Sequence, residues 1–179
     1  MIKSELCSRE ISKEFYDELY KTGYMNEWPD EKKKRILEII KKINLPETGN
    51  ALDFGCGCGV FTKIIKTALP KWNVYGCDIS INAVNEAKKH INNCIFFTND
   101  EPAFFNQKFD FIFTHHVLEH VFDINVITEQ IAQKTAENAK VLHILPCGNK
   151  GSYEYHLCNL RNDGINIEIG NRFFYEDPG

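Results

Sequence analysis

The chain has 179 residues, of which 43% are hydrophobic, and this length and composition fit one globular domain with a substantial core. With 21 basic and 25 acidic side chains its formal net charge is −4, which disfavours nucleic acid and anionic membranes as partners. No apolar run approaches the ~18 residues of a membrane span, and the first residues lack a signal-peptide core, so we expect a cytoplasmic protein.

Two helices are predicted at the start of the chain. Residues 9–23 place apolar side chains at four-residue intervals, which indicates an amphipathic helix. Pro29 suits the first turn of a second helix, which would run to about Asn44 and stop before Pro46. The basic run at 32–35 is followed by isoleucines at helical spacing, and it therefore indicates a solvent-exposed helix face.

A glycine-rich turn follows. Residues 51–54 fit the end of a short buried strand, and Gly55, Gly57 and Gly59 then open a helix over about 59–69. Glycine lets the backbone turn sharply and lets a ligand lie against the backbone N–H groups. A turn without a ligand is the alternative, but such a turn needs fewer than three alternate glycines.

The glycine spacing differs from the dinucleotide fingerprint G-x-G-x-x-G, because Val60 stands where the third glycine is required. Asp53, at the end of the strand, would repel a pyrophosphate and would favour a ligand that carries an ammonium group. The pattern D-x-G-x-G-x-G over 53–59 resembles the first motif of the class I S-adenosylmethionine-dependent methyltransferases, which binds the amino-acid end of that cofactor. The resemblance covers roughly residues 50–146 and implies S-adenosylhomocysteine as the product.

Seven cysteines are scattered through the predicted strands and the glycine turn. An odd, scattered set argues for reduced thiols rather than a disulfide framework. Cys56 and Cys58 have C-x-C spacing without a second close pair, which disfavours a zinc site in the turn.

From residue 50 onward, predicted strands alternate with predicted helices. The strands are expected at 51–54, 73–78, 94–98, 109–114 and 140–145, and the helices near 59–69, 81–91 and 123–137. This alternation predicts an α/β, Rossmann-like, mainly parallel sheet with helices on both faces. Ligands of such sheets bind beyond the carboxyl ends of the strands, so the site residues should lie there.

The second predicted strand ends at Asp78, about 20 residues after the glycine turn, where a carboxylate can accept hydrogen bonds from both hydroxyls of a ribose. Asp78 could instead cap the next helix, but Ser80 is better placed for that role. With Asp78 on the ribose, Ile79 would pack on the face of the adenine.

Asn99 and Asp100 follow the third predicted strand. An adenine amino group needs an acceptor, and a ring nitrogen needs a donor. In the resembled family a polar residue here, commonly Asp, contacts the amino group, which assigns Asp100, together with its neighbour Asn99, to adenine binding. The alternative is that Asp100 caps the turn before Pro102.

The fourth predicted strand leads into His115 and the sequence His-Val-Leu-Glu-His at 116–120. This sequence matches the H-x-x-E-H of a class of zinc proteases. We reject that reading because the motif follows a Rossmann-like strand in a chain whose glycine turn fits another ligand. Many small-molecule methyltransferases of the resembled class have a similar V-L-E-H-V here, and their preceding residue, His115 in this chain, lines the pocket beside the transferred methyl group.

Two chemical roles are considered for this stretch. For an oxygen nucleophile, His115 or His116 has the ordinary pKa and the position of a general base. The ubiquinone-pathway O-methyltransferases and the small-RNA 3′-end methyltransferases hold a divalent metal here with two acids and a histidine. Glu119 and His120 match that set but His116 replaces the first acid, so we expect no metal and keep these three residues as an alternative ligand set.

The chain is expected to form one domain with a helical cap at 1–46, a cofactor-binding core at 47–146 and an incomplete C-terminal part at 147–179. In the resembled families the N-terminal helices fold over the cofactor. A complete fold adds an antiparallel strand pair, which we expect to be missing or abbreviated. The fifth strand would then be an exposed edge, so we expect a homodimer or poor solubility.

The leading hypothesis is S-adenosylmethionine-dependent methylation of a small-molecule acceptor. Methylation of RNA or protein is disfavoured because no basic or aromatic-rich domain is appended. A cofactor-binding module without catalysis is a further alternative, as is a nicotinamide-dependent oxidoreductase, which the glycine spacing opposes. Nothing in the sequence identifies the acceptor.

Overall fold

The computed structural model describes residues 8–24, 27–101 and 107–146. In this part of the chain the strands form one parallel sheet in the order β3-β2-β1-β4-β5. The strands are β1 (Asn50–Phe54), β2 (Asn73–Asp78), β3 (Ile95–Thr98), β4 (Phe109–His115) and β5 (Thr135–Ile144). The order reverses between β1 and β4, which is the switch point where such sheets bind ligands. The predicted Rossmann-like sheet is confirmed.

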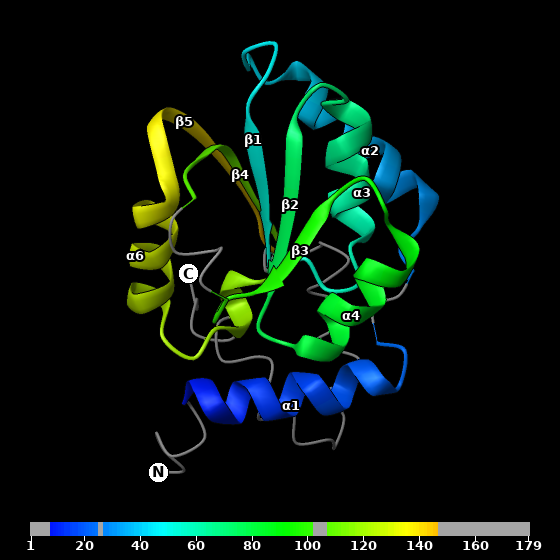
Figure 1. Ribbon diagram of the computed structural model, residues 1–179, viewed down its shortest axis with the longest axis vertical. Coiled ribbons are helices and arrows are strands. Elements are labelled where there is room, and N and C mark those ends of the chain that lie inside the picture. Colours follow the sequence, from blue (N-terminus) through cyan, green and yellow to red (C-terminus); the bar gives the residue numbers. More distant parts are fainter. Residues whose placement is uncertain (1–7, 25–26, 102–106, 147–179) are drawn as a thin grey trace, which may run out of the picture.

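Helices cover both faces of this sheet (Figure 1). They are α1 (Arg9–Lys21), α2 (Asp30–Lys42), α3 (Val60–Ala68), α4 (Ile81–His90) and α6 (Ile124–Lys134), with the 3-10 turn η1 (Leu118–His120). Helices α2 and α3 pack on one face, against Phe111 and Phe113, whereas α6 packs on the other, against Leu52 and Ile112. Successive strand residues point to opposite faces, so each apolar strand is buried on both sides.

Helix α1 lies across the end of the sheet at which the strands stop, rather than on either face (Figure 1). None of its side chains is buried, and Ser8 caps its first turn by accepting a hydrogen bond from the N–H of Ile11. Both predicted N-terminal helices are confirmed, although each ends two residues before the predicted bound. No helix in the described ranges is long and apolar enough to cross a membrane.

The start of β5 corrects the sequence prediction. A helix was expected to reach residue 137, but α6 ends at Lys134 and β5 begins at Thr135, which pairs with Phe109. The intervening residues make an irregular ladder in which Asn138 has φ 64°, a left-handed conformation that Asn tolerates better than most residues. Residues 135–139 are polar or small and carry no strand alternation, so the sequence pattern continued the helix. The expected C-terminal part, 147–179, lies outside the described residues.

Candidate functional site

A cavity opens at the carboxyl ends of β1, β2 and β4, beneath α1, with an empty volume of about 1130 Å³ including space open to solvent. Of the residues predicted from the sequence to bind the cofactor, those that line it are Gly55, Gly57, Asp78, Ile79, Asn99 and His115. Asp53, Gly59 and Asp100 are not on its wall. The six lining residues lie at the carboxyl ends of β1, β2, β3 and β4 or directly after them, where a sheet of this kind binds its ligand.

The glycine turn is held by its own backbone. Gly55 and Gly57 have φ 77° and 52°, and a Cβ on Gly55 would lie 2.4 Å from Val117 Cγ2. The N–H groups of Gly55 and Cys56 donate to the carbonyl oxygen of Cys77, at 2.8 and 2.9 Å. The turn is therefore fastened to β2, and these two N–H groups do not face a ligand as the sequence suggested.

Asp78 is fixed by the same turn. Its Oδ2 accepts a hydrogen bond from the N–H of Gly57 at 2.8 Å, and its Oδ1 accepts one from the N–H of Ser80 at 2.9 Å. Burial raises the pKa of Asp78 to about 6, although the backbone N–H groups lower it. Each carboxylate oxygen keeps a lone pair for a ligand hydroxyl. Ser80 caps α4 by accepting a hydrogen bond from the N–H of Ala83, as the sequence predicted for this serine.

Asp53 lies behind the cavity wall. It is 1% exposed, and its Oδ2 accepts a hydrogen bond from Thr62 Oγ1 at 2.6 Å, which ties β1 to α3. Burial raises the pKa of Asp53 to about 7. Gly59 is the N-cap residue of α3 and lies close to Ile91 and Phe96, and it does not line the cavity. Contact of Asp53 and Gly59 with the cofactor stays a prediction, and the geometry gives both a supporting position.

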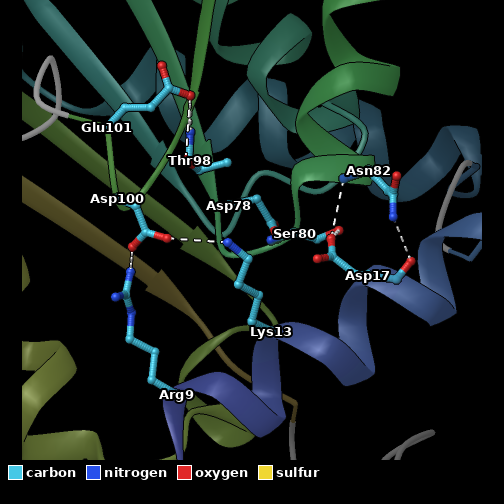
Figure 2. A network of polar contacts seen from close by, with 9 residues as sticks. All are labelled: Arg9, Lys13, Asp17, Asp78, Ser80, Asn82, Thr98, Asp100 and Glu101. Carbon is cyan, nitrogen blue, oxygen red and sulfur yellow. Dashed lines mark hydrogen bonds and ion pairs between the residues drawn. The ribbon is translucent and has the colours of Figure 1, made fainter.

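Asn99 and Asp100 diverge in the structure. Asn99 lines the cavity, and its buried Oδ1 has no hydrogen-bond partner, which is rare for a buried acceptor and indicates a ligand donor. Asp100 instead forms ion pairs with Arg9 and, at 3.4 Å, with Lys13, both on α1 (Figure 2). Of the two residues assigned to adenine binding, Asn99 therefore faces the cavity and Asp100 does not.

A second contact fastens α1 to the loop after β2. Asp17 Oδ1 accepts a hydrogen bond from Ser80 Oγ at 2.6 Å, and its backbone oxygen accepts one from Asn82 Nδ2 at 3.0 Å (Figure 2). Since the backbone N–H of Ser80 also donates to Asp78, the helix is linked to the predicted ribose carboxylate through one residue. The sequence analysis missed Asp17, because a single acid on an amphipathic helix carries no signal of its own.

Aromatic side chains at four-residue intervals form the wall that faces the sheet. Tyr16 and Tyr20 of α1, and then Tyr24 and Trp28, all line the cavity. Burial raises the pKa of each of the three tyrosines above the ordinary range, so their hydroxyls stay protonated at neutral pH.

His115 lies at the end of β4 between two aromatic rings. Its ring centroid is 4.2 Å from that of Phe61 and 4.8 Å from that of Trp28. Neither ring nitrogen of this buried residue has a hydrogen-bond partner, and burial lowers the pKa of His115 to about 3. A histidine of such low basicity is poorly suited to take a proton at neutral pH, which disfavours the role of general base suggested by the sequence.

His116 has both ring nitrogens engaged. Its Nε2 lies 3.2 Å from Lys32 Nζ, and its Nδ1 lies 3.2 Å from Glu119 Oε1. The Lys32 ammonium also lies 4.5 Å from the centroid of the Trp28 ring, a cation–π distance. The prediction of a solvent-exposed basic face therefore holds for Lys34 but is wrong for Lys32, which is half-buried beside the cavity.

The alternative metal ligands lie close together without forming a metal site. His116 and His120 lie 3.2 and 3.7 Å from the same Glu119 oxygen. The described residues nevertheless hold no group of three or more His, Cys, Asp or Glu side chains arranged to bind a metal ion. Glu119 lies in the single turn η1 rather than in a long helix, so the geometry of the rejected zinc-protease motif is also absent from this stretch.

Comparisons with known proteins agree with this geometry. Residues 23–168 match the methyltransferase domain family. A release factor glutamine methyltransferase of Aliivibrio fischeri is 34% identical over 44% of this chain and 30% of its own length. A trans-aconitate 2-methyltransferase of Variovorax paradoxus is 26% identical over 54% of this chain and 38% of its own length. The chain thus matches about a third of the length of each of these curated relatives.

Solved structures share the fold. The complex of DhpI with SAM and HEP is 20% identical with a TM-score of 0.62, over 92% of this chain and 76% of that one. The plantazolicin methyltransferase BpumL, in complex with a pentazolic desmethylPZN analogue and SAH, is 18% identical with a TM-score of 0.59, over 83% of this chain and 65% of that one. Because the family match covers most of the chain and the sheet order is that of the fold, this protein belongs to the methyltransferase domain family, with the Rossmann-like class I architecture.

Proposed function

We propose that this protein transfers the methyl group of S-adenosylmethionine to a small-molecule acceptor and releases S-adenosylhomocysteine. The observation that carries the proposal is the pairing of two groups on one cavity wall. Asp78 presents a carboxylate fixed by two backbone N–H groups, and Asn99 presents a buried oxygen that lacks a donor. A ribose supplies two hydroxyls, and an adenine supplies an amino group, in keeping with these acceptors.

The residues of the cofactor end have distinct tasks in this proposal. Asp78 accepts hydrogen bonds from the ribose hydroxyls, and Asn99 Oδ1 accepts one from the adenine amino group. Ile79, which follows Asp78 directly in the sequence, also lines the cavity and packs on the adenine base. When bound, the cofactor supplies a methyl group already activated on a sulfonium, so the protein's main contribution is to align the acceptor and exclude water.

A small-molecule acceptor is supported by the shape of the site. The cavity lies between α1 and the carboxyl ends of the strands, and Tyr16, Tyr20 and Trp28 line it with aromatic rings, as is common in small-molecule sites. Two of the similar proteins are described with small molecules, trans-aconitate 2-methyltransferase by its name and DhpI by its complex with HEP.

Calorimetric titration tests the cofactor assignment. We expect wild type to bind S-adenosylmethionine and S-adenosylhomocysteine with micromolar affinity and to bind NAD far more weakly. Asp78→Ala should weaken S-adenosylhomocysteine binding by about 100-fold or more, because hydrogen bonds to a charged group contribute about 1.5–3 kcal/mol each. Asp30→Ala, which removes an exposed carboxylate on α2, is the matched control. Preferential binding of NAD would contradict the proposal, and binding without transfer to any acceptor would indicate a module without catalysis.

We also propose a cytoplasmic location and a homodimer. The described cysteines (Cys56, Cys58, Cys77 and Cys94) carry thiols rather than disulfides, as in a reducing compartment. Near the edge of the described sheet, Val141 and Leu145 are 41% and 51% exposed, and apolar edges of this kind favour pairing. Cell fractionation tests the location. Light scattering tests the assembly, and a monomer at high protein concentration would contradict the dimer.

A further inference from the structure

We call the part of the cavity beside His116 its acceptor end. His116 directly follows β4 and lies across the switch point from Asp78, which ends β2, and Asn99, which follows β3. The backbone of His116 has φ 54°, a left-handed conformation that is uncommon outside glycine, and its N–H donates to the carbonyl oxygen of Ile144 at 2.9 Å. Conformations of this kind persist where the surroundings enforce them, often at functional sites. The fold therefore constrains the position of this ring.

A buried carboxylate with unsatisfied hydrogen bonds lies beside this ring. The side chain of Glu119 is 5% exposed, and within the described residues neither of its oxygens has a hydrogen-bond partner. Its Oε1 lies 3.2 Å from His116 Nδ1 and 3.7 Å from His120 Nε2, close enough for ion pairs but not aligned as hydrogen bonds. A buried carboxylate is costly unless a donor or a cation meets it. The two histidine rings are the groups placed to do so, and His116 is the nearer.

The neighbours of His116 assign the tautomer of its ring. A lysine ammonium can only donate hydrogen bonds, so Nε2, which lies 3.2 Å from Lys32 Nζ, presents its lone pair there. The proton of the neutral ring then lies on Nδ1, the nitrogen that faces Glu119. A carboxylate beside Nδ1–H leaves Nε2 as the basic atom and stabilises the ring once Nε2 takes a proton. Such contacts are often poorly aligned without substrate and tighten when it binds.

The other titratable groups at this end are less suited to take a proton. Burial lowers the pKa of His115 to about 3 and also lowers the pKa of His120. Burial raises the pKa of Tyr16 and of Tyr24, the charge of Glu119 adds to both shifts, and their hydroxyls stay protonated. The ring paired with Glu119 is therefore the base that the described residues offer to the cavity. It is one of the two histidines that the sequence predicted for this role.

We propose that His116 Nε2 is the general base of the methyl transfer, that Glu119 positions this ring, and that the acceptor presents a neutral hydroxyl group. This inference rests on the proposed methyltransferase function. An alcohol or phenol loses its proton as it attacks, which is the step that a positioned base accelerates. A carboxylate acceptor needs no base, and an alkylammonium must lose its proton before it can attack.

The step balances in atoms and electrons. The acceptor oxygen forms a bond to the methyl carbon while the carbon–sulfur bond breaks, and the electron pair of that bond stays on sulfur. The hydroxyl proton passes to His116 Nε2, and the ring later returns it to water. To reach Nε2 the hydroxyl takes the place of Lys32, which has a flexible side chain and whose ammonium also lies 4.5 Å from the centroid of the Trp28 ring. The products are a methyl ether and S-adenosylhomocysteine.

Nitrogen NMR of the S-adenosylhomocysteine complex tests this pair of residues without an acceptor. His116→Gly, which suits the left-handed backbone, removes the ring signals and so identifies them. At neutral pH we expect a neutral ring with its proton on Nδ1, and that proton should exchange with water at least about tenfold faster in Glu119→Ala. Glu129→Ala, which removes an exposed carboxylate on α6, is the matched control. A proton on Nε2 in wild type, or equal exchange in Glu119→Ala and wild type, would overturn the inference.

Chemical rescue tests the base during turnover. A small-molecule cell extract and methyl-labelled S-adenosylmethionine supply the substrates, and the initial rate of label transfer is measured. His116→Gly should slow transfer by about 100-fold or more, and added imidazole should restore part of the rate. Glu119→Gln should slow it by at least about tenfold, and both variants should keep the wild-type affinity for S-adenosylhomocysteine. His90→Gln, at an exposed histidine of α4, is the control. A wild-type rate in His116→Gly would overturn the inference.

The labelled product and the metal requirement separate this inference from its alternatives. A methyl ether keeps its label in mild alkali and is uncharged at the methylated atom, which supports the inference. Label in an alkali-labile ester or in a cationic amine would overturn it while leaving the methyltransferase function intact. Loss of transfer on chelation with EDTA, with recovery on adding a divalent cation, would also overturn it, because these residues would then hold a metal. Failure of wild type to bind S-adenosylhomocysteine at all would overturn both the inference and the proposed function.

Discussion

The cofactor end of the cavity is held by the backbone, whereas the acceptor end is held by side chains from distant parts of the chain. At the cofactor end, N–H groups of the glycine turn fix the main chain at Cys77 and the carboxylate of Asp78. At the acceptor end, Lys32 and His116 meet across 84 residues of sequence. Backbone geometry allows few substitutions and suits a ligand that does not vary. Side-chain contacts can be exchanged one at a time, which suits the part that selects the acceptor.

The largest expected effect tests the rigidity of the cofactor end. Gly55→Ala places a Cβ 2.4 Å from Val117 Cγ2 in a left-handed residue, so we expect a loss of about 2–5 kcal/mol in the free energy of unfolding. S-adenosylhomocysteine binding should fall with it. Urea denaturation measures the first effect and calorimetry the second. Gly55→Ala combined with Val117→Ala should recover part of the stability, and no recovery would show that strain in the main chain accounts for the whole loss.

The pH dependence of stability compares two buried titratable residues, Asp53 near the glycine turn and His115 at the end of β4. The pKa of Asp53 is raised to about 7 in the folded protein, so the folded state favours its protonated form. Its stabilising contribution is present below about pH 4 and is lost as the pH rises to 7. Asp53→Asn, which cannot ionise, should gain stability relative to wild type over that range, by up to about 4 kcal/mol. Equilibrium unfolding at a series of pH values measures this difference.

His115 provides a control whose pKa is shifted in the opposite direction. Its pKa is lowered to about 3, so the folded state favours the neutral ring, and stability is lost as the pH falls from about 6.5 toward 3. His115→Phe should therefore be more stable than wild type in acid and should differ least near pH 7. The advantage of Asp53→Asn should grow as the pH rises, and that of His115→Phe should grow as the pH falls; advantages that change with pH in the same direction would contradict the assigned burial of one of the two groups.

Loss of the contact between α1 and the loop after β2 is expected to have an intermediate effect on cofactor affinity. Asp17→Ala removes the acceptor of Ser80 Oγ, and we expect S-adenosylhomocysteine to bind about tenfold more weakly, because a lost hydrogen bond of this kind costs about 1–2 kcal/mol. Asp17→Asn keeps an acceptor oxygen and should bind almost as wild type does. Glu18→Ala, on the next residue, controls for loss of charge on the helix. Equal affinities for Asp17→Ala and wild type would remove Asp17 from the site.

The smallest expected effect on affinity distinguishes two roles for Asp100, an ion pair with α1 or a contact with adenine. In the structure its exposed carboxylate pairs with Arg9 and Lys13, and exposed ion pairs contribute about 0.2–1 kcal/mol each. Asp100→Ala should then weaken S-adenosylhomocysteine binding by about two- to fivefold in dilute buffer, and the effect should vanish at about 1 M salt. A large, salt-independent loss would instead show that Asp100 contacts adenine, as the sequence predicted.

The elements that the sequence predicted well are those encoded by neighbouring residues. Buried strands with apolar runs, the alternate glycines and the acid that ends β2 each leave a local pattern, so the sheet and the position of Asp78 followed from spacing alone. Asp17 and Lys32 left none, because each acts through a residue far along the chain. The assignment of both Asn99 and Asp100 to adenine shows the same limit, since spacing places a residue at the end of a strand but does not give the direction of its side chain.

The attachment of α1 has a consequence for how ligands are exchanged. None of its side chains is fully buried, and hydrogen bonds and ion pairs at Asp17 and Asp100 fasten it to the loops after β2 and β3. Water can satisfy those groups once they separate, so the helix can detach while the sheet and its core stay intact. We expect two tiers of stability, with amide hydrogens of α1 exchanging through local opening and those of β1 and β4 only through global unfolding. Nucleoside turnover would then be limited by a movement that leaves the domain folded.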